Sequence, residues 1–439
     1  MMPQILYIWE RLKGSFLLIP LIIVFLGIVL ATLFIYIDSV VIFNQEGIIN
    51  FIFIGGAESA RSVLSTIAVA MLSVAGIVFS ITLVVLSMAS SQFGPRLLRN
   101  FMYDKLNQIV LGTYLSTFIY CLIVLRSVKS YTDMEFIPNF SIVMSIILAI
   151  GNVILLILYI HHISVSIQAD HIISEVNANL NNNIQKLFSD DLSEEHLEAN
   201  EKYFNELKNT RSFSESVKNK NNGYLEVIDK DNLISIAQDN DLVLFIKYRP
   251  GDFLVEDMEL VKIYSHQKIG DEVKEKIRKA FVLGKVRTPI QDPEFAINQM
   301  VEIAVRSLSA GINDPFTAIT CIDNLTATLC YLTKIKFPSA YLFDDDGQLR
   351  IKVNPILFSG IINASFNQIR QFGKDSPSVI IRMMDALVTI NQLARDKEQK
   401  DDIQRHAKMV LKTAEKTMIE SNDLKDLKKR YEKLKVAYK

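Results

Sequence analysis

The stretch SARSVLSTIAVAMLSVAGIVFSITLVVLSMASSQFG, residues 59–94, decides the architecture of this chain. It carries no charged side chain after Arg61. Hydroxyl side chains recur in it every seven residues, at Thr66, Ser73, Ser80 and Ser87. A period of seven keeps such side chains on one stripe of a helix, and the rise from Thr66 to Ser87 is about 32 Å, close to the roughly 30 Å hydrocarbon core of a bilayer. The sequence therefore predicts a membrane-spanning helix with one polar stripe.

Four stretches of the chain are long and apolar enough to cross a bilayer, and they make the expected membrane domain at 1–163. The predicted spans are 15–37, 63–88, 106–125 and 140–160. The first has no small-residue cleavage site before Asp38, so we expect a retained helix and not a signal peptide. Gly112 and Ser116 of the third span form a small-xxx-small pair, which predicts a close helix contact.

Lys and Arg residues in the loops predict the orientation of these spans. The N-terminal segment carries Arg11 and Lys13, and the region after the second span carries Arg96, Arg99 and Lys105. The other two loops pair few basic residues with several acidic ones. We therefore expect both termini in the cytoplasm and a place in the bacterial inner, or plasma, membrane.

The remaining parts are predicted to be a helical stalk and linker at 164–222, a small α+β module at 223–270 and a helical cytosolic domain at 271–439. The module is indicated by short β-branched and aromatic runs around the turn Arg249-Pro250-Gly251-Asp252. The expected fold class is an α-helical membrane protein with four transmembrane helices, a cytosolic α+β module and a helical region.

Composition and motifs exclude several classes of function. The formal net charge of −1 argues against a nucleic-acid partner. The sequence contains no nucleotide-binding, metalloprotease, EF-hand or serine-hydrolase motif, so we expect no enzyme activity, no cofactor and no metal site. His161 and His162 are adjacent and would point about 100° apart on a helix, which does not suit a shared metal ion.

The segment RSLSAGINDPFTA, residues 306–318, is the densest polar motif after the membrane domain. One interpretation is a turn between helices, with Gly311 as a left-handed C-cap and Asp314 as the N-cap before a proline. The other is a ligand site, because free N–H groups at a helix start attract anions and arginines would add positive charge. The candidate residues for this ligand or turn motif are Arg287, Arg306, Asn313 and Asp314.

Several segments resemble a known family. They are IAVAMLSVAGIVFSITLVVLSMASSQFGPRLLRNF (67–101), LGTYLSTFIYCLIVLRSV (111–128), RPGDFLVE (249–256) and GKVRTPIQDPEFAINQMVEIAVRSLSAGINDPFTAI (284–319). Together they are similar to a bacterial family of predicted inner-membrane proteins that carries a domain-of-unknown-function label. Ala310 stands where the family pattern would place proline. The resemblance implies four membrane spans and a cytosolic domain, and it implies no substrate or catalytic residue.

The first functional hypothesis is a homo-oligomeric channel for ions or small solutes, in contact with membrane lipid, with a cytosolic domain for regulation or assembly. Hydroxyls can solvate a permeating species, and a glycine leaves room for it. The candidate pore-lining residues are Ser59, Thr66, Ser73, Gly76, Ser80 and Ser87. Glu58 and Arg61 are the candidate outer mouth, where they could pair, and Arg96 and Arg99 are the candidate inner vestibule.

The alternative hypothesis is a membrane-anchored assembly or signalling protein that does not conduct. Small residues at regular spacing also let two helices pack closely, so the same stripe would then lie in a dry helix contact.

Overall fold

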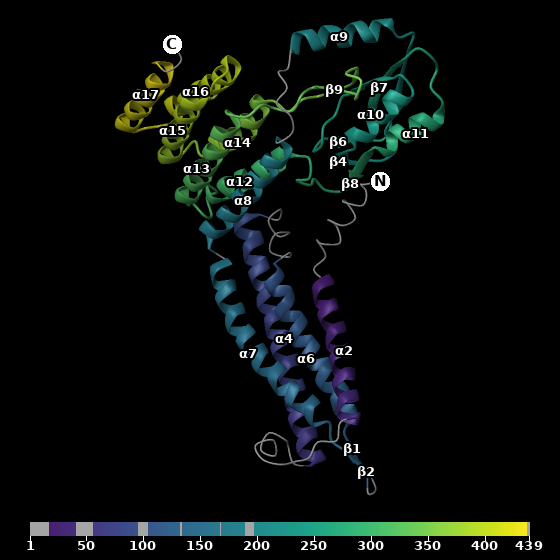
Figure 1. Ribbon diagram of the computed structural model, residues 1–439. Helices are drawn as coiled ribbons and strands as arrows, with labels where there is room; N and C mark the ends of the chain where they lie inside the picture. Colours follow the sequence, from purple (N-terminus) through teal and green to yellow (C-terminus); the bar gives the residue numbers. More distant parts are fainter. Residues whose placement is uncertain are drawn as a thin grey trace. The chain divides into compact units, whose positions relative to one another are not determined.

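A computed structural model describes residues 17–40, 56–94, 104–131, 134–166, 168–188 and 197–436 (Figure 1). The chain divides into two compact units, Met1–His171 and Ile172–Lys439. They are called unit 1 and unit 2 below and are described separately.

Unit 1 contains four helices that are long and apolar enough to cross a membrane, which confirms the four predicted spans. They are α2 (Leu18–Val40), α4 (Ala57–Phe93), α6 (Lys105–Ser127) and α7 (Asn139–Ser166). The strands β1 (Lys129–Tyr131) and β2 (Met134–Phe136) form an antiparallel hairpin between α6 and α7. The long helix α4, with 37 residues, is about 55 Å long and exceeds the bilayer core.

Helix α6 packs against each of the other three helices of unit 1. Small residues bring α2 and α6 close together: a Cβ added to Gly27 would lie 2.0 Å from Ser116 Oγ, and one added to Gly112 would lie 3.0 Å from Pro20 Cα. Ser116 Oγ also donates to the carbonyl of Ile23 at 3.1 Å. The close contact predicted from Gly112 and Ser116 is therefore present.

Acidic side chains fix two helix starts in this unit. Asp104 accepts a hydrogen bond from Leu106 N at 2.9 Å and caps α6. Asp38, near the end of α2, accepts from Phe140 N and Ser141 N at 3.0 Å each and so caps α7. An acceptor at these positions satisfies N–H groups that the helix itself leaves unpaired.

Unit 2 contains two sheets. The five-stranded sheet has the order β3-β7-β5-β10-β9, with β5 and β10 parallel and the other pairs antiparallel. The three-stranded sheet has the order β6-β4-β8 and is antiparallel. The strands are β3 (Phe213–Lys218), β4 (Gly223–Ile228), β5 (Val243–Ile246), β6 (Phe253–Leu254), β7 (Glu259–Ser265), β8 (Phe281–Gly284), β9 (Tyr341–Phe343) and β10 (Leu349–Val353).

The other helices of unit 2 either flank the sheets or belong to a helical bundle. The helices α9 (Leu197–Thr210), α10 (Lys230–Asp239) and α11 (Asp271–Lys279) contact the sheets, and α8 (Ala169–Leu187) contacts the bundle through a hydrogen bond between Asn181 and Thr328. The bundle is α12 (Pro293–Ser307), α13 (Pro315–Leu332), α14 (Phe358–Phe372), α15 (Pro377–Leu393), α16 (Lys397–Thr417) and α17 (Ser421–Val436). Within it, α15 packs against α13, α16 and α17, and α12 packs against α13 and α14.

Three elements differ from the sequence expectation. The helical residues at the start of the expected stalk belong to two helices, since α7 ends at Ser166 and α8 begins at Ala169. Strand β3 lies within 164–222, where a stalk and linker were expected. The strands β9 and β10 lie within 271–439, where helices were expected, because β10 completes the sheet as the parallel neighbour of β5.

Candidate functional site

The helix α4 has two faces with different roles. Its buried face packs on α6 and α7 and contains Ala60, Leu64, Ala68, Met71, Ala75, Val78, Val85 and Ala89. Ser73 and Ala75 are two positions apart and so lie about 200° apart around the helix. The same offset separates Thr66 from Ala68 and Ser87 from Ala89. These three alanines therefore face the bundle, and the three hydroxyls paired with them face away from it.

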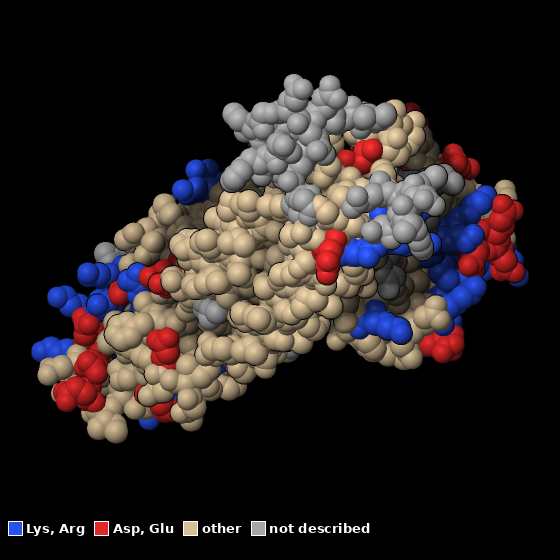
Figure 2. All heavy atoms as spheres, turned by 90° about the horizontal axis from the view of Figure 1, so that it is seen from below, with Lys and Arg blue, Asp and Glu red and all other residues tan. Residues whose placement is uncertain are grey.

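The six candidate pore-lining residues are all exposed on this outer face, and they are called the hydroxyl stripe below: Ser59, Thr66, Ser73, Gly76, Ser80 and Ser87. A Cβ added at Gly76 would meet no atom within 4 Å. The stripe therefore makes no close contact inside its own bundle, and the exposed Val69 and Leu83 lie on the same outer side of α4. The surface of this unit carries few charges, and Figure 2 shows a broad uncharged tan area.

Two hydroxyls of the stripe bond within their own helix. Thr66 Oγ1 donates to the carbonyl of Ser62, and Ser73 Oγ donates to the carbonyl of Val69, both at 2.8 Å. A hydroxyl bonded in this way leaves its oxygen able to accept a further hydrogen bond from water or from a second helix.

The interior of the bundle is polar at positions that the sequence analysis did not select. Side chains on the buried face of α7 are Ser141, Ser145, Asn152, Tyr159 and Ser166. Each is at most 7% exposed. Their spacing of four, seven, seven and seven residues is the signal that would have identified them.

Hydrogen bonds between helices satisfy much of this polar interior. Tyr114 OH donates to the carbonyl of Asn152 at 2.7 Å, and Asn152 Nδ2 donates to Thr117 Oγ1 at 2.7 Å. Tyr120 OH donates to the carbonyl of Ser141 at 2.9 Å, and Tyr159 OH donates to the carbonyl of Val78 at 3.0 Å. These contacts hold α4, α6 and α7 together and fill the centre of the bundle with bonded side chains.

The candidate mouth residues are placed as follows. Glu58 and Arg61 are both exposed at the start of α4. Arg61 Nη2 donates to the carbonyl of Val128 at 3.2 Å, and the described contacts include no ion pair between Arg61 and Glu58. The pairing considered from their spacing is therefore absent here. Arg96 and Arg99, the candidate vestibule, lie outside the described residues.

The motif at 306–318 is a turn between α12 and α13. Asp314 Oδ1 accepts from Phe316 N and Thr317 N at 3.1 Å each, so Asp314 is the N-cap of α13. The hydroxyl of Thr317 donates to the same carboxylate at 2.6 Å and is the main cause that lowers the pKa of Asp314. The left-handed residue of the turn is Asn313, with φ 50°, and not Gly311. Asparagine tolerates this conformation better than most residues other than glycine. The prediction that Gly311 is the left-handed C-cap was therefore wrong, because Asn313 takes that conformation.

The four candidate residues of this motif do not form one site. Arg306 lies at the C-terminal end of α12 and approaches Glu302 at 3.4 Å. Arg287 lies at the other end, where it bonds to Asp292, the N-cap of α12. A helix of 15 residues separates these ends by about 22 Å.

Arg287 instead belongs to a cluster that joins two sequence motifs, RPGD and RTPIQDPE. Arg287 Nη2 lies 2.6 Å from Asp292 Oδ2, and Arg249 Nη2 lies 2.7 Å from Glu294 Oε1. Gly251 has φ 99°, and a Cβ there would lie 2.4 Å from Asp292 Oδ2. Burial raises the pKa of Asp292, and Arg287 opposes this effect. The cluster fixes the turn before β6 against the start of α12.

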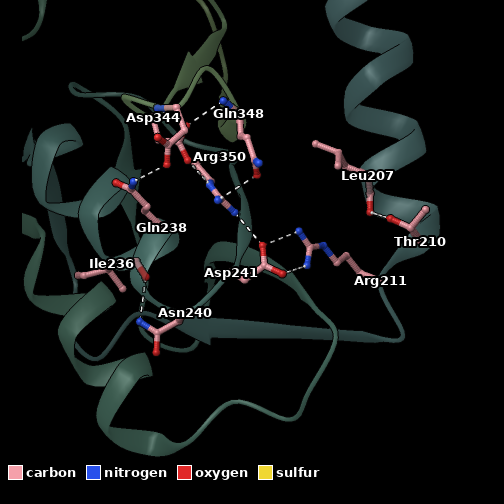
Figure 3. Close-up of polar contacts among 11 residues, drawn as sticks. Leu207, Thr210, Arg211, Ile236, Gln238, Asn240, Asp241, Asp344, Gln348 and Arg350 are labelled. Carbon is pink, nitrogen blue, oxygen red and sulfur yellow. Dashed lines mark hydrogen bonds and ion pairs between the residues drawn. The ribbon is translucent and has the colours of Figure 1, made fainter.

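A second cluster ties three distant segments of unit 2 together (Figure 3). Asp241 bonds to Arg211 through two N–H donors at 2.6 and 2.9 Å, and to Arg350 at 2.8 Å. Arg350 Nε also donates to Asp344 Oδ2 at 2.6 Å. Among the described residues, no group of three or more His, Cys, Asp or Glu side chains is arranged to hold a metal ion.

Comparison with known proteins agrees with the membrane architecture. The profile of a family described as "Predicted membrane protein (DUF2254)" matches residues 13–389. The chain belongs to this family. It is 28% identical over 377 residues to the uncharacterized protein Rv1290c of Mycobacterium tuberculosis and, equally, to the uncharacterized protein Mb1321c of Mycobacterium bovis. These alignments cover 84% of this chain and 71% of each relative. No solved structure matches the chain.

Membership of the family and the four apolar helices place the protein in a membrane. All the segments quoted above for the resemblance fall within the matched range. They include the hydroxyl stripe from Ser73 to Ser87 and the two motifs joined by Arg287 and Arg249.

Proposed function

We propose that the protein forms an oligomeric membrane channel for ions or small solutes, with the hydroxyl stripe of α4 facing the passage. One observation carries the proposal: the stripe lies on the face of α4 that its own bundle leaves uncovered. Hydroxyl groups interact more favourably with water or with a second helix than with lipid chains.

The packing of the bundle supports a passage between copies and not within one. The centre of each bundle is filled by bonded side chains such as Tyr114, Asn152 and Tyr159. Opening a route there would break hydrogen bonds that have no substitute in lipid. A ring of α4 helices from several copies would instead gather the stripes around one axis.

In this proposal, the ends of α4 form the mouths. Glu58 and Arg61 lie at the outer mouth, and Arg96 and Arg99 line the inner vestibule. The exposed Val69 and Leu83 flank the stripe, and apolar side chains of this kind can close a narrow passage by excluding water. Both termini lie in the cytoplasm of a bacterial cell, where unit 2 supports assembly or regulation and has no catalytic role.

The test combines cysteine accessibility with solute flux. Cysteines are introduced singly at Ser73 and Ser80 in a Cys330→Ser background, because Cys121 and Cys321 are buried. We expect both to react with a charged thiol reagent in liposomes. Cysteine at Ala75, which faces the bundle, and at Ile157, which is 64% exposed on α7, should stay unreactive.

Flux from proteoliposomes completes the test. Reaction at Ser73 or Ser80 should reduce the flux of small ions, and reaction at neither position together with no flux would refute the channel. The alternative of a non-conducting assembly protein is favoured by one observation, the self-bonded hydroxyls of Thr66 and Ser73, which need no water. In that case a disulfide between copies should form at position 73 without any flux.

A further inference from the structure

Asp104 and His162 meet at one end of unit 1, where α6 begins and α7 is close to its last residue. His162 Nε2 contacts Asp104 Oδ2. The other oxygen of this carboxylate accepts from Leu106 N at 2.9 Å and caps α6. The imidazole also lies 3.4 Å from Ser166 Oγ in the last turn of α7. One carboxylate therefore holds the first turn of α6 and the last turn of α7 together.

This contact differs from the deeper polar contacts between α6 and α7. The deeper contacts are uncharged and buried, and they involve Tyr114, Thr117 and Tyr120. Breaking one of them would leave a polar group without a partner in the bundle interior, which is costly. The side chains of His162 and Asp104 are 36% and 19% exposed, and Asp104 also accepts from Leu106 N, so their separation leaves neither group buried without a partner. The Asp104–His162 contact is therefore the one that opens most easily.

The Asp104–His162 contact lies next to the point where the chain leaves the membrane bundle. Helix α7 ends at Ser166, α8 begins at Ala169, and unit 2 begins at Ile172. The last turn of α7 is thus the segment through which the chain leaves the membrane bundle.

We infer that the Asp104–His162 pair is a conformational latch, which closes the α6–α7 end of unit 1 and releases the last turn of α7 when it opens. It goes beyond the proposed function, because it operates whether or not the protein conducts.

Hydrogen exchange of the full-length protein in lipid nanodiscs tests the latch. Asp104→Asn removes the charge and keeps an acceptor for the α6 cap, since asparagine is a good N-cap residue. His162→Phe removes the imidazole and keeps an aromatic ring. We expect each change to accelerate amide exchange in peptides covering 160–166 by about five-fold, the effect of losing one partly exposed polar contact.

The matched control is His161→Phe, because His161 is the exposed neighbour on the same helix. It should leave exchange at 160–166 unchanged, and peptides that contain Tyr114 or Asn152 should be unchanged in all variants, which shows that the bundle is folded. The double variant should exchange no faster than either single variant, because both remove one contact. Unchanged exchange in both single variants, or equal acceleration by His161→Phe, would overturn the inference.

Discussion

Arg350 Nη1 donates a 2.8 Å hydrogen bond to Asp241 Oδ1 across 109 residues of sequence. Arg211, just after α9, approaches the same carboxylate with two N–H donors. Asp241 itself lies just after α10 and has φ 47°, in the left-handed region. The two arginines therefore fasten α9 and the β9–β10 hairpin to the segment between α10 and β5 (Figure 3).

This cluster predicts a loss of stability in acid. The hydrogen bond from Arg211 is the main cause that holds the pKa of Asp241 well below its usual range, and Arg350 adds to it. Stability from such a carboxylate is present above the unfolded pKa of about 3.9 and is lost as the pH falls toward the folded pKa. We expect amide exchange in β9 and β10 to accelerate below about pH 4, by an equivalent of about 1 kcal/mol, because the Asp241 side chain is 59% exposed.

Asp241→Asn is the matched variant, since asparagine also accepts the left-handed conformation. At pH 7 the amides of β9 and β10 should exchange faster in this variant than in the natural chain, and this difference should shrink as the pH falls from about 4 to 2. A difference that does not change with pH would contradict this account.

His406 predicts a second acid transition at higher pH. Burial, with Arg405 and Arg370 nearby, lowers the pKa of His406 to about 4. Its neutral imidazole donates from Nε2 to Asn363 Oδ1 at 2.9 Å. The unfolded chain binds this proton near pH 6.5, so stability is present above that pH and is lost as the pH falls from about 6.5 toward 4, by about 3 kcal/mol.

The measurement uses a chain in which Cys321, fully buried in α13, is the sole cysteine (Cys121→Ala, Cys330→Ser). A thiol-reactive dye then reports thermal unfolding of unit 2. The unfolding temperature should fall between pH 6.5 and pH 4.5 in this chain, and the fall should be absent in His406→Gln. An equal fall in both chains would exclude His406 as its origin.

Asn391 predicts a stabilising substitution. Its side chain is 2% exposed in α15, and neither amide atom has a hydrogen-bond partner. Asn391→Leu removes an unpaired polar group at similar volume and should raise the unfolding free energy by about 1–2 kcal/mol. Asn363→Leu is the control, because Asn363 accepts from His406, and it should lower the unfolding temperature instead. Destabilisation by Asn391→Leu would show that its amide has a partner.

Replacement by alanine should lower the stability of unit 2 at Gly251 and leave it unchanged at Gly311. Gly251→Ala forces a Cβ against Asp292, which Arg287 holds in place, at a φ of 99° that alanine rarely adopts. It should cost about 2 kcal/mol or more in unit 2 stability. Gly311 has no atom within 4 Å of an added Cβ and no left-handed φ, so Gly311→Ala should be neutral within about 0.5 kcal/mol. Thermal unfolding with the Cys321 reporter distinguishes the two.

Substitutions on the buried polar face of α7 and on the exposed hydroxyl stripe of α4 should affect the stability of the four-helix bundle differently. Asn152→Ala removes the donor to Thr117 and should destabilise the bundle by about 1 kcal/mol, the usual value of a hydrogen bond between membrane helices. Ser73→Ala is the control and should leave bundle stability unchanged, because Ser73 is exposed and bonds within α4. Unfolding in mixed micelles with increasing sodium dodecyl sulfate measures both, and equal effects would contradict the assignment of the two faces.

The membrane helices could be predicted because each apolar run is longer than a buried soluble helix requires. The hydroxyl stripe was also predictable, because its seven-residue period is visible in the sequence without knowledge of the neighbouring helices. Ser141, Asn152 and Tyr159 were not selected, although they belong to a set that recurs at spacings of four and seven residues, because the spacing alone does not say that this face of α7 is the one that α4 and α6 bury.

The same limit explains the errors in unit 2. The pairing of β5 with β10 joins residues about a hundred positions apart, and no local pattern reveals such a pair. The turn at 306–318 was recognised from Asp314 and Pro315, but Asn313 and not Gly311 takes the left-handed conformation. The contact of Arg249 with Glu294 depends on how the two sheets and α12 meet, which spacing alone does not encode.

The alanine face and the hydroxyl face of α4 together constrain how this helix can change in length. Inserting one residue in its middle would rotate everything beyond that point by about 100° and turn both faces out of register at once. Seven inserted residues restore the register almost completely. A change of length within α4 therefore keeps its two faces in register only when it is close to a whole number of helical turns.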